Sequence, residues 1–566
     1  MTQDRRFGPS IEGDRVRFRL WAPTCDDISI ELESGETERL EAEADGWKQA
    51  LLRAGPGTRY RYRTGNTAFP DPASRLQRGG VHGWSVVCAP SEPIRQWSGR
   101  PWHEAVLYEL HAGLCGGFDG VAKLLPKLAE TGITAVELMP IAAFPGARNW
   151  GYDGVLPFAP VESYGSPQSL RALIARAHAL GIMMFLDVVY NHFGPDGNYL
   201  ALCAKDFFRD DKRTPWGAAI DFRNPTVQQF FSENAQYWIH EFGFDGLRFD
   251  AVHAIADNSW LADLAAELRR DAGGRHIHLV LENDDNDVSF LDDGFDAQWN
   301  DDIHHVLHVL LTGEHAGYYA DFAQSSASKL ARALKEGFVF QGEPSGSHHG
   351  QPRGTASGHL APTSFVAFLQ NHDQIGNRAF GERLTVLADP KALKAAIALL
   401  LLSPQIPLIF MGEEIGSRAP FLYFTDHDEK LARIVREGRR REFGKLVDVE
   451  GDLPDPNAVS SFEASNPFID APDRSAWSSY YRQLLALRHE RLIPHLAGAK
   501  AIDAKAVGEK AVVARWRLGS EKTLVLACNL GNQAVLATFP GAAPCWGAIP
   551  DHTLPPYTTV AWILDT

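Results

Sequence analysis

Four short segments of the sequence end in residues that can do chemistry. They read DVVYNH at 187–192, GLRFDAVH at 246–253, LVLEND at 279–284 and LQNHD at 369–373. Each begins as an apolar run of strand-like composition and ends in Asp, Glu, His, Asn or Arg. Buried strands that deliver polar side chains at their carboxyl ends are how a (β/α)8 barrel builds an active site. Three carboxylic acids on separate strands, with two histidines and an arginine, suit the chemistry of a glycosidic bond.

Cleavage of such a bond needs two carboxyl groups across it, one to protonate the leaving oxygen and one to attack carbon. We predict Asp250 as the nucleophile, because Arg248 lies two residues earlier on the same face of the strand and favours an ionised aspartate. Glu282 ends the apolar run LVLE, where apolar surroundings raise a carboxyl pKa, as a proton donor requires. Asp373 is predicted to hold sugar hydroxyls and to stabilise positive charge. The alternative, that each acid only caps a helix, is better for one acid than for three.

The elements that must position these residues alternate between strands and helices from about residue 104. Amphipathic stretches with apolar residues at helical spacing, such as 120–131 and 169–181, separate most of the predicted strands. Strand–helix repeats imply parallel strands, and eight of them predict an α/β fold with a closed (β/α)8 TIM barrel. The predicted strands lie at 105–113, 133–141, 182–191, 246–253, 277–284, 296–301, 364–373 and 407–414.

Two regions with alternating patterns flank this barrel. Short period-2 segments before residue 92, such as VRFRLWAP and TRYRYRT, predict an N-terminal β-sandwich, and CAPSEPIRQWSG (88–99) is expected to be the linker. A similar pattern after residue 495 predicts a C-terminal β-sandwich. The predicted domains are therefore 1–92, 93–494 and 495–566. Long loops at 141–168 and 192–230 are expected to shape the substrate cleft, and the helix at 475–493 is expected to close the barrel.

Composition excludes several classes of partner. The net charge of −16 argues against nucleic acid and anionic membrane surfaces, which attract basic proteins. Six cysteines without a CxxC pair are typical of free thiols in a reducing compartment. The N-terminus lacks the apolar core of a signal peptide, and no apolar run approaches the roughly 20 residues of a membrane span. We therefore expect a cytoplasmic protein that acts on a neutral substrate.

Three other clusters of charged residues or histidines could bind a ligand, but each also has an interpretation without one. DIHHVLH (302–308) could place two histidines one helical turn apart as a metal pair, but an ordinary helix surface is the better prediction. The acidic run NDDND (283–287) could bind a cation, face solvent as a loop or contact substrate. The basic run 439–441 is expected to be a solvated helix face. We predict no essential metal.

At the four motif segments the chain resembles the α-amylase family of retaining α-glucan enzymes, and the resemblance extends over nearly the whole length. It implies that Asp250 is the nucleophile, Glu282 the acid/base and Asp373 the transition-state stabiliser, with no cofactor. It also implies which residues line the subsite on the nonreducing side of the cleaved bond. These are Asp187, His192, Arg248, His372 and, as an aromatic platform in NWGYD, Tyr152.

Longer stretches resemble one branch of that family. They include DVVYNHFGPDGNYL (187–200), QWNDDIHHVLHVLLTGE (298–314) and YFTDHDEKLARIVREGRRREF (423–443). The branch hydrolyses the α-1,4 bond next to the terminal trehalose of malto-oligosyltrehalose, which implies malto-oligosyltrehalose synthase as a metabolic partner. The segment ENDDND departs from the expected ESDLND, so contacts around the leaving group could differ while the acid is retained.

Residues that choose the leaving group must lie beyond the cleaved bond. His253 is expected to meet the first leaving-group sugar, and Gln374, Asn377 and Arg378 are expected to bind further hydroxyls. For Asn377 and Arg378, bracing of the loop is an equally good interpretation. Three rival functions remain open: a glycogen branching enzyme, a debranching hydrolase, and a non-catalytic α-glucan-binding protein. Intact Asp250, Glu282 and Asp373 argue against the last of these.

Overall fold

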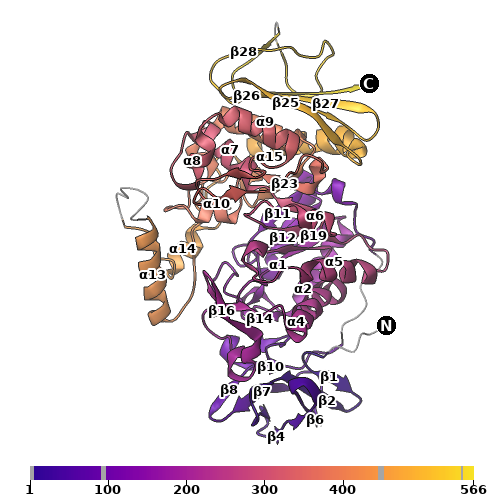
Figure 1. Ribbon diagram of the computed structural model, residues 1–566, viewed down its shortest axis with the longest axis vertical. Helices are drawn as coiled ribbons and strands as arrows, with labels where there is room; N and C mark the ends of the chain where they lie inside the picture. The colour runs from indigo at the N-terminus through magenta and orange to yellow at the C-terminus, as the bar shows by residue number, and fades with distance from the viewer. Residues whose placement is uncertain (1–5, 91–96, 444–451, 550–551, 566) are drawn as a thin grey trace.

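The computed structural model describes residues 6–90, 97–443, 452–549 and 552–565. Figure 1 shows three parts stacked along the long axis, with the N-terminal sheets at the bottom, the barrel in the middle and the C-terminal sheet at the top. The limits of the three domains remain a prediction. The predicted limit between residues 92 and 93, and half of the predicted linker, lie within residues 91–96, which are outside the described residues.

The N-terminal part consists of two antiparallel sheets that share a core. Strand β2 has the sequence RVRFRLW and buries alternate side chains, as a strand with one face on a core does. Two of these, Val16 and Phe18, belong to the same apolar cluster as Tyr60 and Tyr62 of the other sheet. The first sheet has the order β1 (Ser10–Glu12), β2 (Arg15–Trp21), β6 (Trp47–Leu52), β5 (Glu41–Ala42). The second has the order β4 (Thr37–Arg39), β3 (Ser29–Leu32), β7 (Arg59–Thr64), β10 (Trp84–Val86), β9 (Gln77–Arg78), with β8 (Thr67–Phe69) beside β7.

The eight predicted barrel strands are confirmed, and they form a closed parallel barrel in sequence order. Its closure comes from pairing of the first strand with the last. The pairing register sets Asp187 directly opposite Arg248, so two motif residues from different strands become neighbours. The strands are β11 (Leu107–Leu110), β12 (Ala135–Leu138), β15 (Met183–Val188), β18 (Gly246–Phe249), β19 (His278–Leu281), β20 (Ala297–Trp299), β23 (Phe365–Phe368) and β24 (Ile406–Phe410).

Helices surround the barrel, and the predicted helices at 120–131, 169–181 and 475–493 are confirmed. The very apolar α12 is buried on nearly all sides, because it packs between the barrel and the C-terminal sheet. In the described part of the chain, no helix is long and apolar enough to cross a membrane. The outer helices include α1 (Gly117–Thr131), α2 (Pro167–Ala179), α4 (Pro225–Gln236), α5 (Trp260–Asp271), α7 (Asp301–Thr312), α9 (Ser326–Glu336), α12 (Pro390–Leu402) and α15 (Arg474–Leu487).

The long connections carry structure of their own. After β12 the chain forms the hairpin β13 (Ala142–Ala143) and β14 (Leu156–Pro160), and after β15 it forms α3 (Leu200–Cys203) and the hairpin β16 (Phe208–Thr214) and β17 (Gly217–Ile220). The five-residue helix α10 (His372–Gly376) follows β23, and α13 (Glu429–Phe443) and α14 (Val459–Ala464) follow β24.

The C-terminal part is a four-stranded antiparallel sheet with a small two-stranded sheet beside it. The larger sheet packs on α9 and α12, where Trp516 Nε1 donates to the Leu334 carbonyl at 3.2 Å and Thr559 Oγ1 to the Ala395 carbonyl at 2.6 Å. Its strands are β25 (Lys500–Gly508), β26 (Ala511–Arg517), β27 (Lys522–Asn529) and β30 (Thr558–Asp565), and β28 (Val535–Leu536) pairs with β29 (Thr553–Leu554).

The prediction of a helix surface is wrong for the histidines of 302–308. The prediction of a solvated face for 439–441 is confirmed for Arg440 and Arg441 and wrong for Arg439. His304, His305 and His308 of α7 are buried rather than on a helix surface, because this helix runs between the barrel and neighbouring elements. His304 contacts the Leu369 carbonyl, and His308 Nε2 lies 2.7 Å from Glu314 Oε2. Among the described residues no group of three or more His, Cys, Asp or Glu could hold a metal ion. Arg439 is also mostly buried, with its side chain 16% exposed. All six cysteines are free thiols.

Candidate active site

One arginine organises the predicted acids. Arg248, on β18, is fully buried with its guanidinium 4.2 Å from the ring of Trp299. Its Nη1 donates to Asp187 Oδ2 at 2.6 Å and to Asp250 Oδ1 at 2.9 Å, and its Nη2 donates to Glu282 Oε2 at 2.5 Å. A planar guanidinium presents donors in a fixed fork, so it can hold several carboxylates at set angles. Three acids from β15, β18 and β19 are thereby brought to one point.

The predicted nucleophile is held at both oxygens. While Arg248 binds Oδ1 of Asp250, the amide of Asn191 donates to Oδ2 at 2.7 Å and to the Asp250 carbonyl at 2.9 Å. Bonds to both oxygens fix the rotation of the carboxylate about its terminal torsion, which is otherwise broad. Asp250 is therefore presented in one orientation, as attack on a single carbon atom requires.

The backbone directly after Asp250 is strained, and in this conformation it binds Glu282. Ala251, directly after Asp250, has a φ of 40°, a left-handed conformation that is rare for a residue with a Cβ. In this conformation its N–H donates to Glu282 Oε2 at 3.0 Å. Burial raises the pKa of Glu282, and Arg248 offsets only part of that rise. A carboxyl group that keeps its proton at higher pH is suited to act as a general acid.

His372 begins the next cluster. Its Nδ1 lies 2.5 Å from Glu109 Oε1, and its backbone N–H donates to Glu109 Oε2 at 3.2 Å. Burial lowers the pKa of His372, but the charges of Glu109 and Asp373 and the hydrogen bond with Glu109 together outweigh burial and raise the pKa to about 9. Its Nε2 lies 3.6 Å from Asp373 Oδ1. A protonated imidazole therefore stands beside Asp373, whose side chain is 40% exposed toward the cleft.

Tyr152 contacts both Asp187, which is bound by Arg248, and His372, which is bound by Glu109. Its hydroxyl donates to Asp187 Oδ2 at 2.6 Å, and its ring is stacked on that of His372 with centroids 5.1 Å apart. Burial raises the pKa of Asp187 to about 7, against the opposing effect of Arg248. His192 Nε2 lies 3.0 Å from the Tyr152 carbonyl. Every residue predicted for the nonreducing-side subsite is thus brought together around the nucleophile.

The four residues predicted for the leaving-group side contact loops and acids near the carboxylate cluster. His253 is exposed, with Nδ1 accepting from the backbone N–H of Asp284 at 3.2 Å. The amide of Asn377 lies 3.3 Å from Asp373 Oδ1. All three guanidinium nitrogens of Arg378 donate to Glu314 or Glu382, at 2.7 to 3.2 Å. These hydrogen bonds hold the loops in place. Substrate contact by these residues remains a prediction.

Several site residues escaped sequence reasoning. Asp301 accepts from Gln374 Nε2 at 2.9 Å, and burial together with nearby Glu282 raises its pKa to about 8. Asp301 and Glu109 both lie in predicted barrel strands, DAQWND and AVLYELHAG, so an acid within a barrel strand was an available signal. Asn191 precedes His192 in the first motif. Trp216 carried no signal in sequence.

Trp216 forms an aromatic wall at the site. It lies at the tip of the β16–β17 hairpin, 49% exposed, with its ring stacked on His192 at 4.8 Å between centroids. Sugars present apolar C–H faces that can stack on such a ring. The loop at 192–230 therefore places an exposed ring beside His192, one of the residues predicted for the nonreducing-side subsite.

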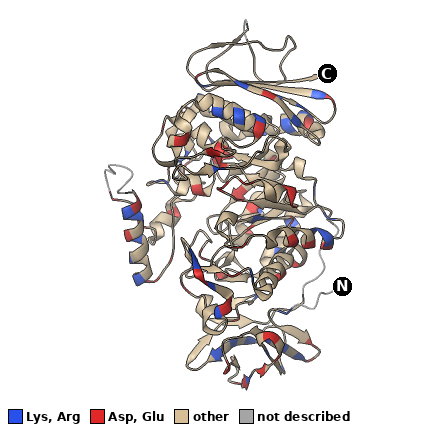
Figure 2. Cartoon of the chain, in the orientation of Figure 1, with Lys and Arg blue, Asp and Glu red and all other residues tan. Residues whose placement is uncertain are grey.

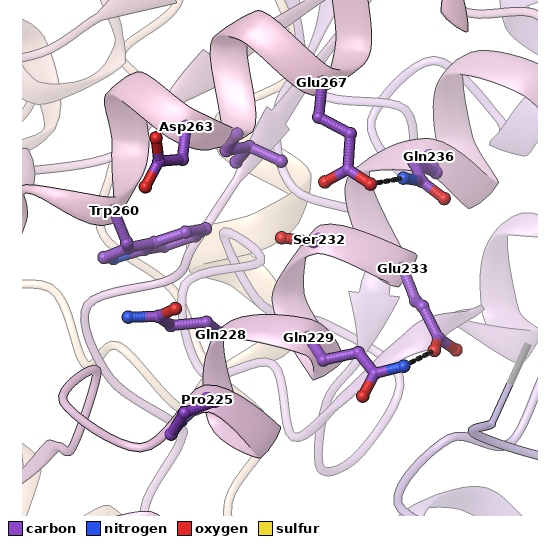
Figure 3. A pocket seen from close by; sticks show the side chains of 10 residues that line it. Pro225, Gln228, Gln229, Ser232, Glu233, Gln236, Trp260, Asp263 and Glu267 are labelled. Atoms are coloured by element: carbon purple, nitrogen blue, oxygen red, sulfur yellow. Dashed lines mark hydrogen bonds between the residues drawn. The ribbon is translucent and has the colours of Figure 1, made fainter.

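A separate hollow of about 400 Å³ lies between α4 and α5. Figure 3 shows its lining of Gln228, Ser232, Trp260, Asp263 and Glu267, among others. None of the predicted site residues lines it. Its polar side chains pair with each other, as Gln236 Nε2 does with Glu267 Oε1 at 2.7 Å, so we assign the chemistry to the carboxylate cluster.

Comparison with known proteins agrees with this geometry. The profile of the α-amylase catalytic domain matches residues 77–216 and 214–439, and a domain of unknown function matches 499–562. A malto-oligosyltrehalose trehalohydrolase of Saccharolobus solfataricus is 40% identical over 508 residues, covering 86% of this chain and 87% of that protein. The chain belongs to the trehalohydrolase branch of the α-amylase family. The trehalohydrolase of Deinococcus radiodurans is 38% identical, covering 86% of this chain and 83% of that protein.

The fold also matches a solved structure throughout. A crystal structure of a candidate α-amylase from Salmonella typhimurium superimposes with a TM-score of 0.94, at 40% identity, covering 99% of this chain and all of the other. The family resemblance expected from the four motifs is therefore confirmed over the whole length of the chain.

Proposed function

We propose that the protein hydrolyses the α-1,4-glucosidic bond next to the terminal trehalose of malto-oligosyltrehalose, and so releases trehalose and a malto-oligosaccharide. The observation that carries the proposal is the shared contact of Asp250 and Glu282 with Arg248, within a chain that belongs to the trehalohydrolase branch. Retaining glycosidases need two carboxyl groups only about 5–5.5 Å apart. The shared contact of Asp250 and Glu282 with one guanidinium brings the two carboxyl groups together, which supports a retaining mechanism.

In the proposed reaction, Glu282 donates its proton to the glycosidic oxygen while Asp250 Oδ attacks the anomeric carbon. The carbon–oxygen bond breaks, and trehalose leaves with the proton of Glu282. Water then attacks the covalent glycosyl–Asp250 intermediate, and Glu282 takes a proton from that water. The sugar is released with its anomeric configuration retained, and both side chains return to their starting states.

The remaining residues act by binding and by charge. Stacking on Tyr152 and Trp216 would hold the sugar ring of the nonreducing-side subsite. Asp187, His372 and Arg248 would bind its hydroxyls, and Asp373 would stabilise the oxocarbenium-like charge at the transition state. His253, Gln374, Asn377 and Arg378 would form or support the trehalose side. A pocket built to bond trehalose hydroxyls rejects leaving groups that lack them, because unpaired buried groups are costly.

The deciding experiment compares two substrates. Purified protein is incubated with maltopentaosyl trehalose and, separately, with maltoheptaose, and the products are identified by chromatography. The proposal expects free trehalose from the first and little cleavage of the second. New α-1,6 linkages would indicate a branching enzyme, and reducing ends without trehalose would indicate a debranching hydrolase. A Glu282→Gln variant separates catalysis from binding, since it should lose about 10²- to 10⁴-fold in kcat while a binding protein would be indifferent.

We further propose a cytoplasmic location and metabolic coupling to malto-oligosyltrehalose synthase, which would make the substrate. The absence of a membrane-crossing helix in the described chain and the acidic net charge support a protein that associates with neither membrane nor nucleic acid. Fractionation of cells that express the protein, with trehalose measured when either enzyme is deleted, tests both parts.

A further inference from the structure

The transition-state residue Asp373 lies on a very short helix that other elements must hold in place. At the start of α10, Asn371 Oδ1 accepts from the Gln374 N–H at 3.0 Å, and Glu109 binds His372. At its last residue the helix packs directly on an indole, since a Cβ at Gly376 would lie 2.0 Å from Trp150. A five-residue helix has little stability of its own, so its orientation depends on these contacts.

The C-terminal end of α10 is also held from an insertion far along the chain. Arg439 of α13 donates from Nη2 to the Gly376 carbonyl at 2.8 Å and from Nη1 to Asn377 Oδ1 at 3.3 Å. A cation at the last carbonyls of a helix is favourable, because those carbonyls are otherwise unpaired and carry partial negative charge. Asn377 in turn donates to Asp373 Oδ1 at 3.3 Å.

Arg439 is held more firmly than the rest of its helix. Its guanidinium lies between two rings, 5.0 Å from Tyr423 and 4.7 Å from Phe443. Tyr423 in turn meets Trp150 edge-on, with centroids 5.1 Å apart. Of α13 itself, only Ala432 and Phe443 are buried. The helix stands beside the main body in Figure 1, and basic residues recur along it in Figure 2.

We propose that Arg439 is a positioning residue for hydrolysis, which ties α13 to α10 and thereby fixes the positions of Asp373 and Asn377. The insertion after β24 is then part of the catalytic apparatus although it contributes no reacting atom. The proposal rests on the assignment of Asp373 to transition-state stabilisation. It goes beyond that assignment by naming what holds Asp373, and it predicts a loss in kcat rather than in affinity.

The test compares Arg439→Ala with Arg440→Ala, its neighbour on the exposed face of α13. With maltopentaosyl trehalose, Arg439→Ala should lower kcat about 10- to 100-fold with little change in KM, because displacements near 1 Å in a site cost rates of this order. Arg440→Ala should match the wild type. Arg439→Lys, which keeps the charge but cannot contact both acceptors, should fall between them with an unchanged melting temperature.

A double variant tests the route of the effect. If Arg439 acts through the end of α10, the kcat losses of Arg439→Ala and Asn377→Ala should not multiply in the double variant. Multiplying losses, an unchanged kcat, or a raised KM at constant kcat would each overturn the proposal. If Arg439→Ala does not fold, the same comparisons are made with Arg439→Lys. Should the wild type release no trehalose, the proposed function fails, and the Arg439 comparison is then read with maltoheptaose.

Discussion

At the scale of single residues, the carboxyl groups of the site differ in their hydrogen-bond donors and in their pKa. Asp250 has both oxygens bonded to donors, whereas Glu282 accepts at Oε2 from Arg248 and Ala251 and has its pKa raised by burial. Two acids in different environments can take the two roles of a retaining glycosidase. The two roles thus follow from which carboxylate oxygens are bonded to donors and from the raised pKa of Glu282.

This division predicts the pH dependence of activity. Glu282 must be protonated to act, and its pKa lies above the usual value of about 4.3. Activity should therefore persist above the pH at which an ordinary glutamate ionises, and fall as pH rises through the raised pKa. A profile of kcat/KM against pH measures this alkaline limb. The residual activity of Glu282→Gln should lack it, and a limb at the ordinary glutamate pKa in the wild type would contradict the assignment.

Glu137, on β12 below the site, gives a prediction about stability. It is fully buried with neither carboxylate oxygen hydrogen-bonded, and burial, then Glu109 and Asp187, raise its pKa well above the usual value. The folded protein then keeps a proton that the unfolded chain loses above about pH 4.3, so Glu137 costs about 1.4 kcal/mol of stability per pH unit between that point and its own raised pKa.

Glu137→Gln should remove this cost. The neutral amide has nearly the same shape, so the variant should be as stable as the wild type at pH 4 and increasingly more stable as pH rises toward 7. Urea unfolding at several pH values measures the difference. Equal slopes of stability against pH for the two proteins would show that Glu137 is ionised in the fold.

At the scale of elements, the β16–β17 hairpin presents the exposed ring of Trp216 beside His192. Trp216→Ala should raise KM several-fold, because it removes the stacking surface beside His192, and should leave the melting temperature nearly unchanged, since exposed substitutions typically shift stability by less than about 0.5 kcal/mol. Leu202→Ala on α3 is the matched control, with a similar exposure of 41%. A lowered melting temperature with unchanged KM would make Trp216 a packing residue.

At the scale of the whole molecule, one apolar cluster joins the three parts, although the N-terminal and C-terminal sheets each also have a smaller cluster of their own. A single cluster of buried apolar side chains runs from Phe7 and Trp47 through the barrel to Trp516 in the C-terminal sheet. Arg488, fully buried after α15, donates to the carbonyls of Leu401, Ser403 and Gln405 and so fastens the region where barrel and C-terminal sheet meet. Parts with a continuous apolar core are expected to unfold together.

Calorimetry should accordingly show one cooperative transition rather than three. Trp516→Ala should destabilise that transition by about 3–5 kcal/mol, as expected for loss of a fully buried indole, and activity should be lost at the same lowered temperature. Ile502→Ala, at a 50% exposed position of the neighbouring strand β25, is the control. An early transition that leaves activity intact would show that the C-terminal sheet folds independently.

The sequence by itself determined the barrel and which acids lie at the ends of its strands. The eight strands and the helices between them could be predicted because strand alternation and helical period are local properties of the chain. Asp250, Glu282 and Asp373 could be predicted because each ends an apolar strand, and parallel strands of a barrel all end at one face. These are inferences about types of residue at positions along the chain, and they need no knowledge of distant neighbours.

Only the tertiary structure decided which side chains meet. The contact of His372 with Glu109 joins residues 263 positions apart, and the contact of Arg439 with Gly376 comes from an insertion that looked like a solvated helix. The histidines of α7 have the period of a helix surface but are buried by neighbours on every side. A residue's own segment sets its local geometry, whereas closure of the barrel and packing of its insertions set its surroundings, and these depend on segments far away in sequence.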